Sequence, residues 1–365
     1  MKRNINKWWL WLLFSVVLLG AVACQQERET YKTLQNLIQA SVAPDGPGVV
    51  LYVNGPDFGE QLFTRGAANR ERGTAVRTIS HYRLAGLTKP FISTLVLQMI
   101  TEGKLTMEDT IADHLPELAA EIPNSDQITI RQLLTMTSGL PDFRDNPEFW
   151  EVVKQQEKRG WRPEEVLPYI ADTAVTGEPG AEFNYSNTNY IVLQLILLTL
   201  FEEPFEEELQ DRILDVLDLQ DTYIEPFGLT TGGHIGGYAD IDGDGVEESM
   251  IPYDDARSMG DLGLISNALN LAEFAPALYE RALPGEEKTD ALVPMGNGDE
   301  YGYGIMRRQS PFGEMWGYAS TASGFSNQMW YLPDKETTVI VLINAEEEVL
   351  GNQLLQDALT AVFAE

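Results

Sequence analysis

Cysteine and histidine are scarce in this chain, and each scarcity excludes a class of site. Cys24 is the only cysteine, so no intrachain disulfide can form. The three histidines, His81, His114 and His234, lack the His-Glu-x-x-His spacing and have no second ligand close in sequence. We therefore expect no zinc site, and nothing else in the sequence calls for a cofactor.

Positive charge is also scarce. The chain has 25 Lys and Arg residues against 56 Asp and Glu residues, which gives a formal net charge of −31. Such a surface repels phosphate backbones and anionic lipid headgroups, so we expect no nucleic-acid partner and no adhesion to membranes through surface charge. The composition predicts a strongly solvated surface.

A long apolar run occurs at the N-terminus, from Trp8 to Ala23, behind the basic residues Lys2, Arg3 and Lys7. A basic start, a short apolar stretch and small residues at its end are typical of an export signal. The run has 16 residues, which is short for a membrane span, although a tilted anchor stays open.

Cys24 directly follows Ala21-Val22-Ala23, an arrangement that resembles a bacterial lipobox, in which the cysteine is lipidated. Ala21 stands where leucine is more usual, and the same three residues suit an ordinary secretory cleavage site. We expect a signal peptide over residues 1–24 and a membrane-anchored lipoprotein of the cell envelope, facing the periplasm or the surface. A freely secreted product is the alternative.

Residues 25–365 contain two kinds of hydrophobic pattern. Both ends predict strands with a covering helix: a helix over 27–40, strands over 49–53, 61–64, 327–332 and 338–344, and a helix with apolar residues between 350 and 363. The middle predicts helices over 91–100, 129–137, 190–200 and 206–217. We therefore expect a sheet part of about 27–85 and 255–365, with a helical part of about 86–254 inserted, and a ligand site between them.

The segment from Tyr82 to Phe91 has the spacing of a catalytic motif. Gly86 and Lys89 are three residues apart, and this spacing places a nucleophile and a lysine on one face of the first turn of a helix. There a desolvated lysine can lose its proton, and the positive helix end favours the nucleophile. Pro90 is tolerated only in that first turn.

Two further segments complete a set. Tyr185 and Asn187 form a Tyr-x-Asn motif, and Tyr318-Ala319-Ser320 lies in a glycine-flanked stretch before the last predicted strands. In order and spacing, the set resembles the Ser-x-x-Lys, Tyr-x-Asn and His/Lys-Ser/Thr-Gly motifs of penicillin-binding proteins and class C-type β-lactamases. Segments 102–106, 128–141, 260–266 and 301–304 are also similar, so the resemblance runs from about Glu29 to the C-terminus.

The resemblance implies an α+β fold, with an antiparallel sheet flanked by terminal helices and an inserted all-helical subdomain. It implies that Tyr185 takes part in proton transfer and that Asn187 contacts substrate and lysine. It also implies an oxyanion hole formed by the backbone N–H groups of residue 86 and Thr321.

The chain departs from the family at two of the three motifs. Gly86 stands at the nucleophile position and has no side chain, so we expect ordinary acyl-enzyme chemistry to be absent. Tyr318 replaces the cationic or imidazole group that would meet a substrate carboxylate. Ser320 places a side chain where glycine leaves room, and it is the substitute nucleophile that we consider, ahead of Thr88 and Ser93.

The retained residues allow two interpretations. Lys89, Tyr185 and Asn187, with the N–H groups of Gly86 and Thr321, can hold a carboxylate or carbonyl without cleaving it. Alternatively, the three side chains are a hydrogen-bonded relic that stabilises the domain interface.

The stretch Asp240-Ile241-Asp242-Gly243-Asp244-Gly245 begins like a calcium loop, with acidic residues at alternate positions. Its twelfth position is Ile251, where a bidentate glutamate is needed, so we favour a tight acidic turn over a metal site.

The sequence thus predicts an envelope lipoprotein of this hydrolase family that is catalytically disabled and binds a small-molecule or peptide ligand, cell-wall derived, or a partner protein. The alternative is an esterase, peptidase or β-lactamase that acts through a rearranged nucleophile. The expected contact with the membrane is the lipid on Cys24.

Overall fold

The computed structural model describes residues 28–155, 160–171, 173–224, 234–253, 255–282 and 292–364. Cys24 and the predicted signal peptide lie outside these residues. None of the described helices is both long and apolar enough to cross a bilayer.

The largest sheet in the described part of the chain has eight antiparallel strands in the order β10-β11-β12-β13-β14-β15-β1-β2. This confirms the predicted α+β class with an antiparallel sheet. Its strands are β1 (Val49–Gly55), β2 (Gly59–Arg65), β10 (Val293–Pro294), β11 (Glu300–Gly302), β12 (Ile305–Ser310), β13 (Gly313–Ala322), β14 (Phe325–Leu332) and β15 (Thr337–Ile343).

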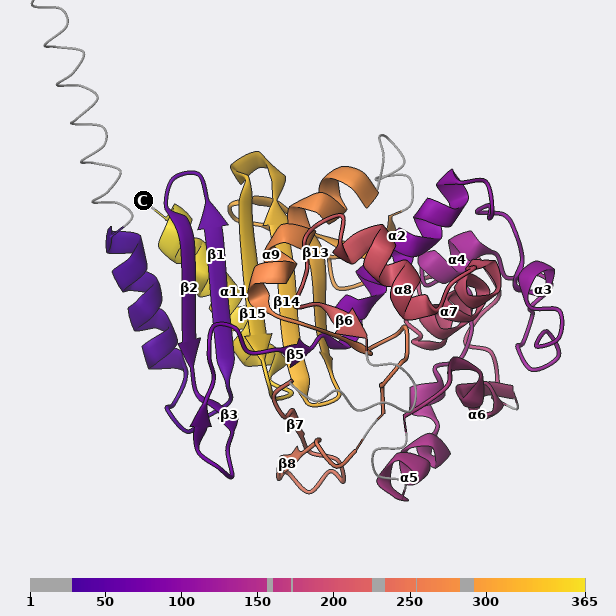
Figure 1. The fold of residues 1–365 in the computed structure, drawn as a ribbon, viewed down its shortest axis with the longest axis horizontal. Helices are drawn as coiled ribbons and strands as arrows, with labels where there is room; N and C mark the ends of the chain where they lie inside the picture. The colour runs from indigo at the N-terminus through magenta and orange to yellow at the C-terminus, as the bar shows by residue number, and fades with distance from the viewer. Residues whose placement is uncertain are drawn as a thin grey trace, which may run out of the picture.

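The two ends of the chain meet inside this sheet. Strand β1 lies between β15 and β2, with Val49 opposite both Ile343 and Arg65. Residues 49–53 of β1 and all of β15 are buried, which explains why their sequences are continuous apolar runs instead of alternating patterns. Figure 1 shows helix α9 (Ala268–Ala277) in front of the sheet and helix α11 (Glu348–Phe363) behind it.

The helix over residues 28–41 packs beside the first strands. Leu34 and Ile38 are fully buried in the core. Tyr31, which the pattern places on the same face, is 44% exposed and instead lies tilted against Phe63, with ring centroids 4.9 Å apart. It therefore covers the edge of the sheet.

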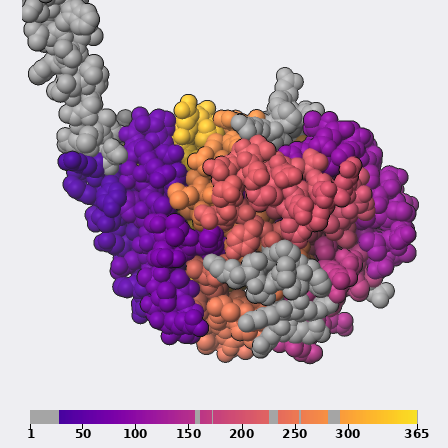
Figure 2. All heavy atoms as spheres, in the orientation of Figure 1, coloured from indigo at the N-terminus to yellow at the C-terminus, as the bar shows by residue number. Residues whose placement is uncertain are grey.

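The middle of the chain is mainly helical and lies at the other end of the molecule from β1 and β2 (Figure 2). Its helices are α2 (Thr88–Thr101), α3 (Ile111–His114), α4 (Ile130–Leu134), α5 (Pro147–Gln155), α6 (Pro168–Ala171), α7 (Thr188–Leu200) and α8 (Phe205–Leu209). Short helical turns are η1 (Ala85–Leu87), η2 (Phe143–Asp145), η3 (Pro163–Val166), η4 (Gln210–Leu214), η5 (Leu278–Ala282) and η6 (Pro333–Lys335).

Smaller sheets accompany the large one, and one of them joins the two parts. β5 (Tyr82–Arg83) and β6 (Tyr223–Ile224) flank β9 (Leu264–Ser266) in a three-stranded sheet. β3 (Ala67–Asn69) pairs with β4 (Thr74–Ala75), and β7 (Tyr238–Ala239) pairs with β8 (Glu248–Ser249).

Two predicted helices were wrong in extent. The helix expected over 129–137 ends at Leu134, because Met136 adopts a left-handed backbone with φ of +57°. The helix expected over 206–217 divides into α8 and the π-helical turn η4. Hydrophobic spacing does not report either interruption, since both are changes of backbone conformation.

Candidate functional site

The start of α2 brings Gly86 and Lys89 to the junction of the sheet and the helical part. Ala85, the first residue of η1, has a left-handed φ of +51°, and η1 continues into α2 without a break. Gly86, Lys89 and Pro90 are all buried in these first turns. Because Pro90 lies in the first turn of α2, its missing N–H costs no helical hydrogen bond.

Lys89 is completely buried, and two acceptors hold its ammonium group. Its Nζ donates to Asn187 Oδ1 at 2.8 Å and to the Asp261 carbonyl at 3.1 Å. Burial lowers the pKa of Lys89 from 10.5 to about 8, although the charges of Asp261 and Asp142 oppose the shift. A minor neutral fraction is therefore present near pH 7.

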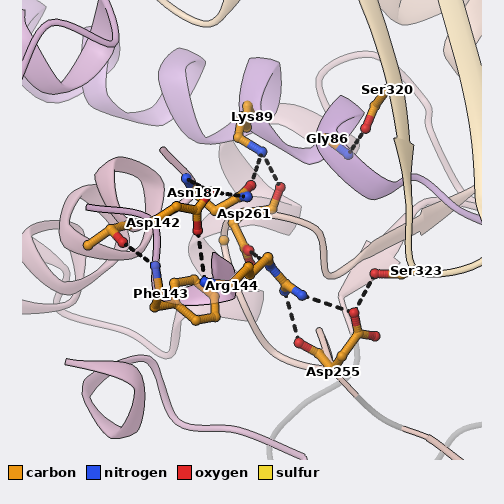
Figure 3. A network of polar contacts seen from close by, with 12 residues as sticks. Gly86, Lys89, Asp142, Phe143, Arg144, Asn187, Asp255, Asp261, Ser320 and Ser323 are labelled. Carbon is orange, nitrogen blue, oxygen red and sulfur yellow. Dashed lines mark hydrogen bonds and ion pairs between the residues drawn. The ribbon is translucent and has the colours of Figure 1, made fainter. Parts of the chain in front are cut away.

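Asn187 is oriented by a second carboxylate. Its backbone N and its Nδ2 donate to Asp142 Oδ2 at 2.9 and 2.7 Å, so its Oδ1 faces Lys89. The Tyr185 hydroxyl donates to the same Oδ1 at 3.3 Å. The structure thus brings Lys89, Tyr185 and Asn187 together (Figure 3 shows the contact of Lys89 with Asn187).

The environment of the Tyr185 hydroxyl does not favour its action as a base. The residue is 38% exposed, but burial of its hydroxyl, reinforced by the charge of Asp142, raises its pKa above 10. At neutral pH the hydroxyl is therefore a hydrogen-bond donor.

Tyr318 lies in a cluster of tyrosines where the family motif would supply a cation. It is fully buried, its ring centroid is 6.0 Å from that of Tyr301, and burial raises its pKa well above 10. The Tyr301 hydroxyl is 3.0 Å from that of Tyr190, which is 3.0 Å from Ser93 Oγ. Tyr318 is thus neutral, and Ser93 is part of this buried chain of hydroxyls.

Ser320 occupies the space beside Gly86. The Gly86 N–H donates to Ser320 Oγ at 2.8 Å, a contact that Figure 3 shows next to Lys89. A Cβ atom at position 86 would lie 2.7 Å from Ser320 Oγ, 3.0 Å from Ser320 Cβ and 3.1 Å from Tyr318 Cε1. The residue at position 86 therefore has no room for a side chain while Ser320 and Tyr318 stay in place.

Two other predicted residues lie apart from this contact. Thr88 Oγ1 accepts the Leu264 N–H at 3.1 Å, so it holds α2 against β9. Thr321 follows Ser320 in β13, and its hydroxyl is 3.0 Å from Ser326 Oγ on β14. The role of the Thr321 N–H in an oxyanion hole stays a prediction.

Sequence reasoning missed a buried charge network beside Lys89. Arg144 Nε donates to Asp261 Oδ2 at 2.8 Å, and Arg144 Nη1 donates to Asp255 Oδ2 at 2.9 Å. Ser323 Oγ donates to the same Asp255 oxygen at 2.6 Å (Figure 3). Burial by itself lowers the pKa of Arg144, but the charges of Asp261 and Asp255 outweigh it and raise the pKa above its usual range, so the guanidinium stays charged. No local pattern links these residues, because Arg144 lies more than 100 positions from both aspartates and Ser323 lies 68 positions from Asp255.

A cavity of about 300 Å³ opens next to this network. Its wall includes the charged residues Arg144, Asp255 and Glu346 and the apolar residues Trp150 and Met250. Burial, with the nearby charges of Asp255 and Glu247, raises the pKa of Glu346 above its usual range. The cavity combines apolar walls with a few polar groups, as small-molecule sites do.

The acidic stretch at residues 240–245 is a compact exposed turn. Carboxylate oxygens of Asp240, Asp242 and Asp244 lie within 4.8 Å of one another. However, Asp240 accepts the N–H groups of Gly243 and Gly245, each at 2.8 Å, and so closes the turn itself. This geometry fits the acidic turn that we favoured from the sequence, and a metal there stays an untested alternative.

Similarity to known proteins extends over nearly the whole chain. The family model described as Beta-lactamase matches residues 34–361. Penicillin-binding protein 4* of Bacillus subtilis (strain 168) is 25% identical over 333 residues, which cover 85% of this chain and 71% of the relative. Protein flp of Staphylococcus aureus (strain MW2) is 26% identical over 178 residues, which cover 48% of this chain but only 34% of that relative.

Solved structures show the same fold. The D-stereospecific amidohydrolase from Streptomyces sp. has a TM-score of 0.79 at 23% identity, and the match covers 92% of this chain and 98% of that one. The penicillin-binding protein from Bacillus halodurans has a TM-score of 0.72 at 22% identity, covering 86% and 96%. The matches include both the large sheet and the inserted helices.

Proposed function

This chain belongs to the beta-lactamase family, and from that premise we propose that it is a catalytically disabled member, anchored in the cell envelope, that binds a ligand or a partner protein. The family's acyl-transfer chemistry needs a hydroxyl oxygen that becomes covalently bound. Gly86 supplies none, and loss of the nucleophile alone costs about a millionfold in kcat in a related serine-hydrolase setting.

The single observation that supports the proposal most directly is the contact between Gly86 and Ser320. The Gly86 N–H, a donor that would stabilise an oxyanion, donates to the Ser320 hydroxyl at 2.8 Å. The position therefore lacks both a nucleophile and a free donor. The raised pKa of Tyr185 is consistent with this proposal, since its hydroxyl stays protonated.

Lys89 and Tyr185 both donate to Asn187 Oδ1, Asn187 donates to Asp142, and Lys89 also donates to the Asp261 carbonyl. Because the hydrogen-bonding groups of these residues are already paired within the protein, we favour a stabilising relic over direct contact with a ligand. We therefore place the ligand in the cavity lined by Arg144, Trp150, Met250 and Asp255, which adjoins the relic.

The ligand that we propose is a small molecule or peptide derived from the cell wall. The support is the likeness to penicillin-binding proteins of Bacillus subtilis, one of which covers 85% of this chain. The same likeness and the predicted lipobox at Cys24 support an envelope location.

A second candidate function is hydrolysis through Ser320. The observation that favours it is the place of the hydroxyl, because Ser320 Oγ lies 2.7 Å from where a Cβ of residue 86 would be. Its hydrogen bond to the Gly86 N–H does not activate a nucleophile, however, since activation needs a neighbouring base or a lowered pKa. We therefore rank this candidate second.

Intact-mass spectrometry of the signal-free protein tests both candidates. The protein is incubated with a fluorescent penicillin and with an activated fluorophosphonate, alongside Ser320→Ala. We expect no covalent adduct on either protein, and a thermal shift with a D-alanyl-D-alanine peptide that reports binding. An adduct on the wild type overturns the loss of catalysis, and its disappearance in Ser320→Ala supports the second candidate.

A further inference from the structure

Positions 86 and 320 show a reciprocal exchange relative to the family motifs, with glycine at the nucleophile position and serine at the motif's glycine position. We propose that the Ser320 side chain is an internal plug: it occupies the position at the Gly86 N–H where an anion would bind. Glycine at position 86 and serine at position 320 then act together to keep that position closed. The proposal rests on the proposed function, because it assumes that the closed position is inactive in the wild type.

The donor that Ser320 covers is well suited to an anion. The Gly86 N–H lies in η1, immediately before the 14-residue helix α2, where the positive end of the helix dipole favours negative charge. The Ser320 hydroxyl already accepts this N–H at 2.8 Å. A carboxylate or phosphonate oxygen would therefore have to displace the hydroxyl, and a glycine at 320 removes that competition.

The same side chain also blocks any substituent at position 86. The Cβ of a non-glycine residue there would meet Ser320 Oγ at 2.7 Å and Ser320 Cβ at 3.0 Å. Gly86 does not have a positive φ, so the backbone itself accepts an L residue. The steric conflict thus comes mainly from Ser320. Tyr318 Cε1, at 3.1 Å, requires only a shift of a few tenths of an ångström.

Other groups of the site remain in place around the plug. Lys89 lies one helical turn from Gly86, and Asn187 and the Asp261 carbonyl hold its Nζ. With a hydroxyl introduced at position 86 and glycine at 320, a fluorophosphonate can react there. An O–P bond forms, the P–F bond breaks, fluoride leaves, and neutral Lys89 accepts the hydroxyl proton.

Intact-mass spectrometry after incubation with the fluorophosphonate tests the plug. It is carried out on four proteins: the wild type, Gly86→Ser, Ser320→Gly and the double variant. We expect an adduct on the double variant that forms at least about tenfold faster than on Gly86→Ser, and none on the other two. Equal labelling of Gly86→Ser and the double variant overturns the plug, and so does a double variant that folds but is not labelled.

A stability measurement keeps the test valid if Gly86→Ser does not fold. Gly86→Ala is compared by urea unfolding in the wild-type and Ser320→Gly backgrounds. We expect it to lower the unfolding midpoint in the wild type and to lower it less, or not at all, with glycine at 320. The control background is Thr321→Gly, which places glycine in the same strand but removes a side chain bonded to Ser326.

If Gly86→Ala lowers the unfolding midpoint equally in all three backgrounds, the proposal is overturned. These experiments also distinguish the plug at Ser320 from the proposed loss of catalysis. Labelling of the wild type overturns the proposed loss of catalysis, whereas a missing coupling between positions 86 and 320 overturns the plug alone.

Discussion

Lys89 has no contact with solvent, and its environment sets its chemistry. An exposed lysine keeps its proton across the physiological range, but burial lowers the pKa of Lys89 from 10.5 to about 8. Its partners are an amide oxygen and a backbone carbonyl, neither of which is charged. Its stabilising effect must therefore depend on pH.

We predict that the wild type becomes more stable relative to Lys89→Met as the pH rises above 8. Below that pH both the folded and the unfolded chain hold the proton, and the cost of burying the charge is fully present. Between about pH 8 and 10.5 only the unfolded chain holds it, so the free energy of unfolding increases. Between about pH 7 and 9.5 the difference should grow by about 2 kcal/mol.

Urea unfolding of both proteins at several pH values measures this difference. Lys32→Met, at a residue whose side chain is 63% exposed, serves as the control for removal of a lysine charge. A difference between the wild type and Lys89→Met that stays flat or falls with pH would contradict the assigned burial of the charge.

At the scale of the elements, Arg144 joins segments that are far apart in the chain. It lies on η2, and its partners Asp255 and Asp261 lie in the segment that leads into β9. The side chains of all three are at most 9% exposed. Such a pair contributes little by comparison with well-packed apolar residues, but removing one partner leaves a buried charge without compensation.

Arg144→Met should therefore destabilise the protein by about 3–5 kcal/mol, because Asp255 and Asp261 lose their counter-ion. Thermal and urea unfolding measure the loss. The matched change in an exposed pair, Lys32→Met, removes the contact with Glu29 and should cost less than about 1 kcal/mol. Similar losses for the two variants would show that the network is not a buried one in solution.

At the scale of the whole molecule, our proposal for the location of the protein rests on its charge and its N-terminus. A net charge of −31 disfavours attraction to anionic lipid. In our proposal, envelope attachment depends on the first 24 residues and on a lipid at Cys24.

Cys24→Ser should move the protein from the membrane fraction to the soluble fraction, because the thiol that accepts the lipid is gone. Cell fractionation and immunoblotting measure this, and the mass of the mature N-terminus identifies the lipid. Unchanged membrane association of Cys24→Ser would exclude the lipoprotein anchor, whereas a soluble wild type would favour the secreted alternative.

Much of the fold could be predicted from the sequence. Strands β1, β14 and β15 and helices α2, α7 and α11 lie within a few residues of their predicted positions, because each has a continuous apolar run or helical spacing. The Gly86 and Lys89 spacing likewise indicated the helix start correctly. The ends of α4 and α8 could not be predicted, because a left-handed Met136 and a π-helical turn leave no mark on hydrophobic periodicity.

The sequence by itself determined which groups are missing: no side chain at Gly86, no cation at Tyr318 and no second cysteine to pair with Cys24. Tertiary structure alone decided which group lies beside Gly86 and which charges meet in the interior. The contact of Gly86 with Ser320 spans 234 positions, and that of Arg144 with Asp255 spans 111. Local patterns encode helices and strands, whereas such contacts, and the burial that lowers the pKa of Lys89, arise only when these elements pack.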